Sequence, residues 1–456
     1  MTSGSTSSYG RETHTGEAFA ELGRFVASFE WEDADEGLRE QLYKTLLDTA
    51  GVMIAGARTG EVRALVEAWD PDAGPAHLFG GGKTTVDAAA YLNGISAVAL
   101  ELDEGNKYAK GHPASHAFPA ALAVAQARRA SGSELAAALV VGHELASRFG
   151  RATRLDAGVH PHGNWGVVGA AAAASRLMGL DAEATASALD GACGLALATP
   201  WESALHGNPV RNAWVGAANF SGIVAARMAS ASVARVTGTP EASLGRILGE
   251  FEPAELTEEL GSRFDLGNAY FKRHASCSYT HPPADAVLEI LDQRPDLDPG
   301  RVRSILVETY RVAAALNLTE CRTRLAAMFS VPYVVAAALS TGNCRPEAFD
   351  EERRTDLEIR RLMSLTSVAA TEEFDRGLPE KRGARVTVEL QDGATFAAEV
   401  PNPVGDADYR PFGLEEIRGK LEVLLGPLGV EVEKLETAVR GLLSAEDVGR
   451  ALERFP

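Results

Sequence analysis

Long segments built from small residues constrain the fold of this 456-residue chain more than any other feature. Several segments carry alanine at helical spacing, and one of them contains five consecutive alanines, Ala170–Ala174. Alanine has the highest helix propensity, and small side chains let neighbouring helices approach closely. The sequence therefore predicts a compact, mostly helical protein, with helices over residues 117–130, 133–147, 166–177, 181–198 and 213–229.

The N-terminal part continues this helical pattern after a polar start. Residues 1–16 are rich in Ser, Thr and Gly and lack an apolar core segment, so we expect a disordered tail and no signal peptide. Residues 17–29, 33–63 and 86–102 mix apolar and polar side chains at helical spacing, which predicts further helices.

The pattern changes after about residue 266. Residues 301–310 alternate apolar and polar side chains as a strand does. Residues 385–390 and 395–400 flank Gln391-Asp392-Gly393, which is a hairpin signal. Three prolines within residues 401–412 predict a linker. Amphipathic helices are expected to close the chain over residues 414–425, 430–443 and 444–454.

These patterns predict two structural units. The first is a large helical domain formed by both ends of the chain, residues 17–266 and 405–456. The second is an inserted α+β domain, residues 267–404, which we expect to act as a lid.

Charge and cysteine content exclude several classes of protein. Lys and Arg total 44 and Asp and Glu total 63, so the formal net charge is −19. This balance argues against binding to nucleic acid or to an anionic membrane surface. The cysteines form no CxxC pair, so neither a zinc ribbon nor a thioredoxin-type motif is predicted; they are Cys193, Cys277, Cys321 and Cys344. The expected compartment is the cytoplasm.

Four groups of polar residues could carry chemistry, and the fourth is the segment that contains Tyr333. An acidic loop ends at His112 and offers an acid or base beside carboxylates, although a solvated loop of mixed charge has the same composition. His160 and His162 precede a helix start, where backbone N–H groups favour anions; a metal site or a structural turn are the alternatives. A dense polar segment near residue 272 adds cations and a thiol at the expected domain junction. The members of these groups are Glu101, Asp103, Glu104, Lys107, Lys110, His112, His160, His162, Lys272, Arg273, Cys277 and Tyr333.

Taken in order, several motifs resemble the MmgE/PrpD family, and the resemblance covers nearly the whole chain after the tail. The motifs are Tyr91-Leu-Asn93-Gly94, the Leu102-Asp103 loop leading to His112-Pro113, Gly158-Val-His160-Pro161, Phe271-Lys272 to His281-Pro282, and Phe329-Ser330-Val-Pro332-Tyr333. The resemblance implies the two-domain architecture above, a homodimer, and an active site between the domains.

The resemblance also implies proton chemistry on a small polycarboxylate without a metal or cofactor. Carried over by position, the catalytic residues are His112, His160, Lys272 and Tyr333, with either histidine as the base. The substrate-binding residues are Glu101, Asp103, Arg211, Arg273 and Cys277. On a chain of charge −19, a pocket for such a substrate must be locally positive, and the cations above are expected to supply that charge.

The chain departs from the better-known members of this family at several of these positions. Gly105 stands where their acidic loop has threonine, Arg211 and Trp214 replace a lysine and a histidine, and Cys277 replaces a histidine. Arg211 keeps the positive charge but cannot release a proton at neutral pH. The resemblance implies a dehydratase-like lyase, and the departures fit an epimerase or isomerase better than a decarboxylase. The alternatives are an epimerase of a small dicarboxylate such as iminodisuccinate, and a catalytically silent protein that binds carboxylates.

Overall fold

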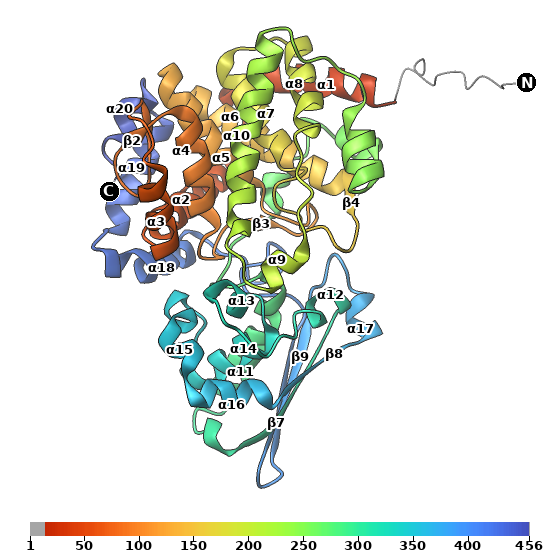
Figure 1. Ribbon diagram of the computed structural model, residues 1–456, viewed down its shortest axis with the longest axis vertical. Helices are drawn as coiled ribbons and strands as arrows, with labels where there is room; N and C mark the ends of the chain where they lie inside the picture. Colours follow the sequence, from red (N-terminus) through yellow and green to blue (C-terminus); the bar gives the residue numbers. More distant parts are fainter. Residues whose placement is uncertain (1–13, 456) are drawn as a thin grey trace, which may run out of the picture.

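The computed structural model describes residues 14–455 and divides into two regions (Figure 1). The larger one, here called the helical region, contains the first ten α-helices. These are α1 (His14–Ser28), α2 (Glu36–Ala57), α3 (Gly60–Trp69), α4 (Val86–Val98), α5 (Pro113–Arg128), α6 (Gly132–Ala152), α7 (Val167–Met178), α8 (Ala182–Cys193), α9 (Trp201–Leu205) and α10 (Val210–Ser230).

Small residues set the packing at the centre of the helical region. Helices α5, α6, α7 and α10 contact one another, and Ala170–Ala174 of α7 are fully buried among them. A Cβ atom at Gly169 of α7 would lie 2.6 Å from the carbonyl oxygen of Gly142 in α6. The two backbones are therefore in direct contact, which only a residue without a side chain allows at this position.

The last three helices pack against the first ones. They are α18 (Leu414–Leu425), α19 (Val432–Leu443) and α20 (Val448–Leu452). Helices α18 and α19 contact α2, α19 also contacts α6, and α20 contacts α5. In Figure 1 they form the blue layer beside α2 and α3. Both ends of the described chain thus belong to the helical region.

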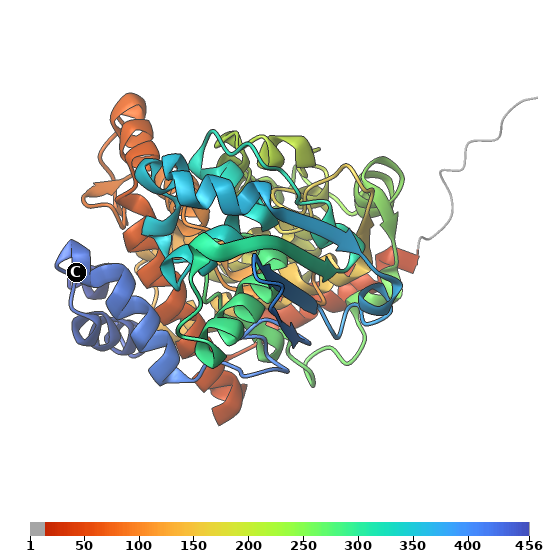
Figure 2. The same ribbon diagram turned by 90° about the horizontal axis from the view of Figure 1, so that it is seen from below.

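The smaller region, residues 281–400, is here called the sheet region. Its four-stranded sheet has the order β10-β9-β7-β8, from β7 (Val302–Thr309), β8 (Thr366–Ala370), β9 (Ala384–Leu390) and β10 (Thr395–Val400). The β9–β10 hairpin is antiparallel, with Val388 opposite Phe396, and β8 is parallel to β7. Figure 2, seen from below, shows these strands lying across the front of the helical region.

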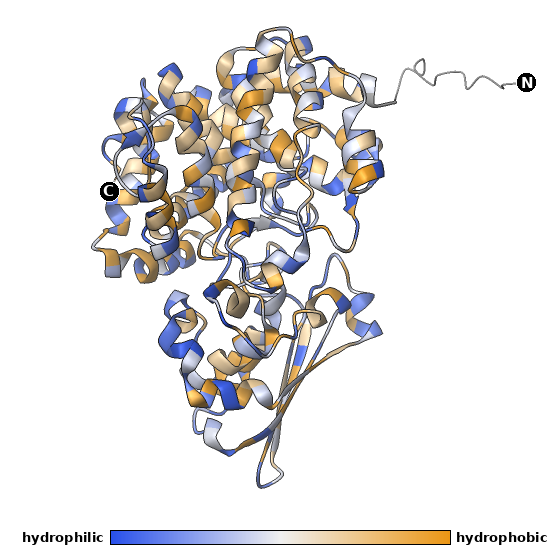
Figure 3. Ribbon diagram, viewed as in Figure 1, coloured by the Kyte–Doolittle hydropathy of each residue, from blue (hydrophilic) through white to orange (hydrophobic). Residues whose placement is uncertain are grey.

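Two longer helices pack against this sheet, α11 (His281–Gln293) on β9 and β10 and α14 (Val331–Thr341) on β8. The other helices of the region are α12 (Arg311–Ala314), α13 (Arg324–Met328), α15 (Glu351–Thr355), α16 (Leu357–Ser364) and α17 (Glu372–Asp375). Alternate residues of β9, from Ala384 to Leu390, are buried against α11. Hydrophobic residues are distributed along the helices of both regions, whereas the segments between the two regions include hydrophilic stretches (Figure 3).

Short strand pairs position the segments that join the two regions. β3 (Gly105–Asn106) pairs with β6 (Ala269–Tyr270), so the acidic loop lies beside the chain that leads into the sheet region. The other pairs are β1 (Ala76–His77) with β2 (Lys83–Thr84) and β4 (Thr153–Leu155) with β5 (Gly249–Phe251).

The mostly helical fold class agrees with the sequence prediction, and several details differ. Residues 14–16 of the expected tail are helical, and residues 1–13 lie outside the described range. The helix expected over residues 33–63 is split into α2 and α3, and β8 was not predicted. The domain boundaries and the lid role stay predictions. Within residues 14–455, no helix has the length and apolar character needed to cross a membrane.

Candidate active site

A cavity of about 670 Å³ lies where the helical region, the sheet region and their connections meet. Among the described residues that line it, six are basic and two are acidic. The basic ones are Lys107, Lys110, Arg151, Arg154, Arg211 and Arg382, and the acidic ones are Glu101 and Glu255. This chain of net charge −19 therefore builds a locally positive cavity, as a site for an anionic ligand requires.

The acidic loop fixes two buried cations beside the cavity. Glu101 turns the chain after α4 with a φ of 53°, which is uncommon for a residue other than glycine. Its carboxylate pairs with Arg211 at the start of α10. Lys272 Nζ donates to Asp103 Oδ1 at 2.9 Å and lies 3.5 Å from Glu101 Oε2. All four side chains are buried, so each charge depends on the others for its compensation.

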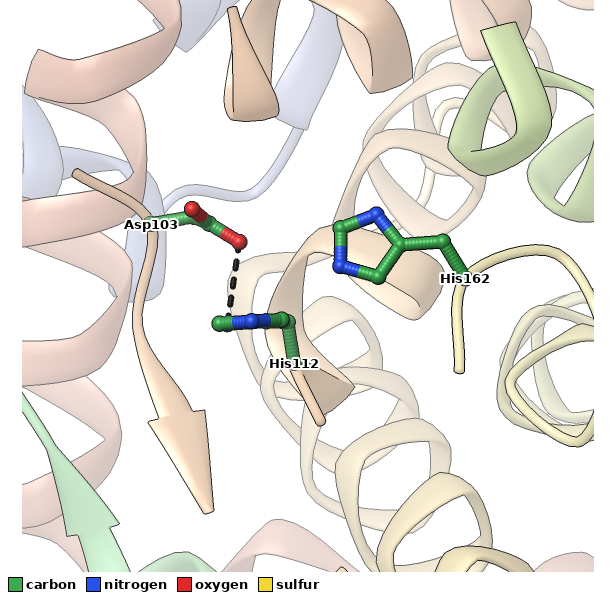
Figure 4. A group of neighbouring side chains, drawn as sticks. All are labelled: Asp103, His112 and His162. Atoms are coloured by element: carbon green, nitrogen blue, oxygen red, sulfur yellow. Dashed lines mark ion pairs between the residues drawn. The ribbon is translucent and has the colours of Figure 1, made fainter. Parts of the chain in front are cut away.

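His112 is held in one tautomer at the N-terminus of α5. Its Nδ1 lies 2.7 Å from the Glu104 carbonyl oxygen and 3.0 Å from Asp103 Oδ2 (Figure 4). Both partners are acceptors, so Nδ1 carries the proton and Nε2 of the neutral ring is an acceptor. His112 lines the cavity, and its Nε2 has no hydrogen-bond partner among residues 14–455. The ring is therefore arranged as a proton acceptor.

Electrostatics keep Asp103 ionised despite its burial. Burial alone opposes ionisation, but the neighbouring His112 ring and the Lys272 ammonium hold the pKa of Asp103 well below its usual range. The carboxylates of Asp103 and Glu101 in turn raise the pKa of Lys272 against the effect of burial. At neutral pH the pair is a carboxylate and an ammonium. Lys272 therefore donates hydrogen bonds but does not transfer a proton.

Two further histidines in the turn before α7 are hydrogen-bond donors. His160 Nδ1 accepts from the His162 backbone N–H at 3.1 Å, so the neutral His160 ring carries its proton on Nε2. His162 Nε2 accepts from Arg211 Nη2 at 3.4 Å, which places the His162 proton on Nδ1. Burial and the charge of Arg211 hold the pKa of both rings well below the usual range, so both are neutral.

His116 connects this turn to α5. Its Nδ1 donates to the His112 carbonyl oxygen at 2.8 Å, and its Nε2 accepts from the Gly163 backbone N–H at 3.2 Å. Burial lowers the pKa of His116 to about 4. The ring is neutral and structural, and it fixes the turn that carries His160 and His162 relative to His112.

Unpartnered donors gather at this end of the cavity. Arg211 Nε and His162 Nδ1 are buried and have no hydrogen-bond partner within the described chain. The Arg211 guanidinium also lies 5.3 Å from the centre of the Phe329 ring. Buried donors are almost always paired in native proteins, so these two are suited to a carboxylate that enters the cavity.

A metal ion is the other ligand to consider here. One ligand atom each from Asp103, His112 and His162 lie within 4.8 Å of one another (Figure 4). However, Lys272 binds Asp103 and Arg211 binds His162 Nε2. Two of the three residues of this group therefore already contact a positive charge. A cation brought here would be repelled by both, and the group fits an anion better.

Comparison with protein families decides the relationship. The MmgE/PrpD N-terminal domain matches residues 20–244, and the MmgE/PrpD C-terminal domain matches residues 274–442. The chain belongs to the MmgE/PrpD family. The resemblance inferred from the motifs is thereby confirmed, and the two matched segments cover both the helical and the sheet region.

Similar members of the MmgE/PrpD family carry related names. Cis-aconitate decarboxylase of Aspergillus terreus is 27% identical over 469 residues, with 95% of each chain covered. Cis-aconitate decarboxylase-like protein oryM of Aspergillus oryzae is 26% identical and covers 96% of this chain and 97% of its own. Human cis-aconitate decarboxylase is 26% identical over 79% of this chain and 77% of its own. A lyase-like enzyme is the coarse function that these relatives support.

The structure brings most of the predicted MmgE/PrpD site residues together, but not all. Glu101, His112, His160, Arg211 and Cys277 line the cavity. Asp103 and Lys272 lie directly behind them through the contacts above. Burial raises the pKa of the Cys277 thiol to about 12, so it is a neutral wall residue and no nucleophile.

Tyr333 and Arg273 are not among the described residues that line the cavity, and their functional roles stay predictions. Tyr333 donates from its hydroxyl to the Ala348 carbonyl oxygen at 2.7 Å inside the sheet region, and it is not among the described residues that line the cavity. Arg273 is 45% exposed at its side chain and pairs with Asp285 at 3.0 Å. Both side chains have a partner that is not among the residues lining the cavity.

Sequence reasoning missed several residues of the cavity. Arg382 and Tyr310 come from the sheet region, and Tyr270 from the connection before it. Arg382 lies in a loop without a motif, so no local pattern could indicate it. Tyr270 opens the dense polar segment that contains Lys272, but no pattern there distinguished it as a cavity residue.

Proposed function

We propose that this protein is a lyase-type enzyme that removes a proton from the carbon α to a carboxylate of a small di- or tricarboxylate, without a metal or cofactor. One observation carries the proposal. In a positive cavity, the Asp103–His112 pair presents a free Nε2 acceptor beside the unpartnered donors of Arg211 and His162. A base next to an anion site is what α-proton abstraction requires.

The residues divide the work as follows. Arg211 Nε–H and His162 Nδ1–H bind the substrate carboxylate, and His112 Nε2 takes the α-proton. The electron pair of the broken C–H bond moves into the carboxylate, and the donors stabilise the added charge. Asp103 stabilises the imidazolium that forms on His112. His160 Nε2–H, a neutral donor, completes the set.

Dehydration follows if the substrate carries a hydroxyl on the neighbouring carbon. The electron pair forms the new C=C bond as the C–O bond breaks, and the His112 imidazolium returns its proton to the departing oxygen. One water leaves and His112 is neutral again, so the step balances without another acid. This suits the site, because the pKa of both His160 and His162 is lowered and neither can supply a proton at neutral pH.

Decarboxylation is a second candidate, favoured by the names of relatives that match 95% of the chain. In that reaction His112 Nε2 first takes up a proton from solvent. Carbon dioxide then leaves without its bonding electron pair, and the pair that stays takes this proton from His112, which becomes neutral again. The same residues serve both reactions, so the products must decide between them.

The test is incubation of the purified protein in D₂O with citrate, 2-methylcitrate, cis-aconitate and iminodisuccinate, followed by NMR. We expect α-deuterium exchange together with loss of water or carbon dioxide for one of these compounds. Exchange without either product would assign the epimerase alternative. Carboxylate binding without exchange would assign the silent binding protein, and it would overturn the proposal.

A further inference from the structure

The cavity has a second cationic end, formed by Arg382 of the sheet region and by Lys107 of the segment before α5. Arg382 Nη2 donates to Asp406 Oδ2 at 3.0 Å, and Lys107 Nζ donates to Asp406 Oδ1 at 2.9 Å. Arg382, Lys107 and Asp406 are all buried, and the two cations line the cavity. The single carboxylate of Asp406 is thus shared by two buried positive charges. The second acid near Lys107, Asp408, is half exposed and pairs from the solvent side.

Two buried polar atoms at this end have no partner in the described part of the chain. They are Nε of Arg382 and the hydroxyl of Tyr310, whose residues are 6% and 1% exposed. Native proteins leave few buried donors unpaired, and each such case calls for a missing acceptor. Both residues line the cavity, so a ligand in the cavity can supply that acceptor.

The Arg382 guanidinium is fixed in place before any ligand arrives. Its Cζ lies 4.7 Å from the centre of the Tyr270 ring, which adds a cation–π contact to the Asp406 pair. The Tyr270 ring in turn fills the space beside Gly105, where a Cβ atom would lie 2.4 Å from the Tyr270 hydroxyl. The residue that replaces the family's threonine therefore makes room for the ring that supports Arg382.

An aromatic wall connects this end to the His160 end of the cavity. The ring centroids of His160 and Trp201 lie 4.5 Å apart, those of Trp201 and Tyr279 6.3 Å, and those of Tyr279 and Tyr310 5.8 Å. All four line the cavity. Anion-binding groups thus stand at both ends of this row of aromatic rings.

We infer that Arg382, supported by Tyr310, binds a second carboxylate of the substrate while Arg211 binds the first. This rests on the proposed function and names the residues that would hold the second carboxylate of its substrate. An arginine fork that already holds one carboxylate through Nη2 can bind another through its Nε edge. Monocarboxylates would engage one end only and would bind weakly.

The experiment compares a tricarboxylate with a monocarboxylate on the full-length protein. Calorimetry measures the dissociation constant of tricarballylate, a tricarboxylate without a leaving group, and ligand-observed NMR measures that of butyrate. For Arg382→Gln we expect at least a tenfold weaker affinity for tricarballylate and a change below twofold for butyrate. Tyr310→Phe is expected to weaken tricarballylate about threefold, because one neutral hydrogen bond is lost.

Two further variants protect the test against misfolding. Arg382→Lys keeps the charge opposite Asp406 but loses the fork, so it should fold as the wild type does and still bind tricarballylate at least threefold less tightly. Arg385→Gln is the matched control, because Arg385 pairs with the surface acids Glu373 and Glu399 outside the cavity. Its affinities should equal those of the wild type.

Three results would overturn the inference: equal tricarballylate affinity in the wild type and both Arg382 variants, equal weakening of both probes, or no binding of tricarballylate to the wild type. The D₂O exchange test of the proposed function is separate. Arg382-dependent binding without exchange would leave this subsite intact and remove the reaction. Exchange that is unchanged in Arg382→Gln would leave the reaction intact and remove the subsite.

Discussion

At the Arg211 end of the cavity two buried cations face two buried carboxylates, whereas at the Arg382 end two buried cations share the single buried carboxylate of Asp406. The first end is closely balanced in charge, and its ionised Asp103 is free to orient His112. The second end has only one buried carboxylate, because its other acid, Asp408, is half exposed. We infer from this difference that buried cations and carboxylates have a different role at each end. At the Arg211 end they hold the base His112, and at the Arg382 end they hold a ligand.

The largest expected effect is on catalysis at the Arg211 end. His112→Ala should lower kcat/KM about a thousandfold, as loss of a general base does, and should leave the melting temperature within a few degrees of the wild type. The measurement is turnover or D₂O exchange on the substrate identified above.

His206→Ala is the matched control, because His206 is exposed and is not among the described residues that line the cavity. Near-full activity of His112→Ala would contradict the assignment of the base. The Arg211 end could then no longer be distinguished from the Arg382 end as the place where the reaction occurs.

Removing one cation from each end tests the charge balance directly. Lys272→Ala leaves Glu101 and Asp103 with too little positive charge, and we expect it to lower the free energy of unfolding by about 3–5 kcal/mol. Lys107→Ala leaves Asp406 paired with Arg382, so we expect a loss of about 1–2 kcal/mol. Urea denaturation at pH 7 measures both.

Lys434→Ala, at an exposed pair with Glu431, should cost less than about 1 kcal/mol and serves as the control. Equal losses for Lys272→Ala and Lys107→Ala would show that the two ends do not differ in charge balance. An unchanged free energy of unfolding in Lys272→Ala would show that Lys272 has no structural role and would leave only a role in catalysis.

Acid should lower the stability of the protein at the Arg211 end of the cavity, because the buried histidines there are neutral. The pKa of His116 falls from 6.5 to about 4 on folding because of burial. Between these values the unfolded state binds the proton and the folded state does not, so stability falls as the pH drops from 6.5 to 4. One such histidine contributes about 1.4 kcal/mol per pH unit.

His116→Gln should therefore have a shallower loss of stability between pH 6.5 and 5 than the wild type, measured by urea denaturation at several pH values. His160 and His162 add to the wild-type slope in the same direction, since the pKa of each is also lowered. A wild-type stability that is flat over this range would contradict the neutral state assigned to these rings.

The smallest effect is expected from Tyr333, which lies at neither end. Tyr333→Phe should change kcat/KM less than twofold and should cost about 1 kcal/mol of stability, because the Ala348 carbonyl loses its donor. A tenfold loss of activity at unchanged stability would return Tyr333 to the reaction and would require a different cavity from the one described.

The sequence allowed the helical region to be predicted because its signals are local. Alanine content and spacing located α5, α6, α7 and α10 within a few residues. Strand β8 was missed because Thr366–Ala370 contains two alanines and no strict alternation, and its state depends on pairing with β7. Tertiary contacts there override propensity.

The site could be predicted only where motifs carried it. The acidic loop, His112 and His160 lie in recognisable segments, and the cavity contains or adjoins them. The structure places Tyr333 outside the cavity lining. Motif order could not indicate this, because it does not give the direction of a side chain. Arg382 was missed because its role depends on Asp406 and Tyr270, which are distant or unmarked in the sequence.

The contact between Gly105 and Tyr270 also predicts that these two positions vary together among related sequences. A side chain at position 105 and a tyrosine ring at position 270 would occupy the same volume, so neither position can change freely while the other stays. We expect members of the MmgE/PrpD family with threonine at the equivalent of 105 to carry a smaller residue at the equivalent of 270. The two positions then mutate as a unit, and an aligned set of sequences can reveal which members share the Arg382 end.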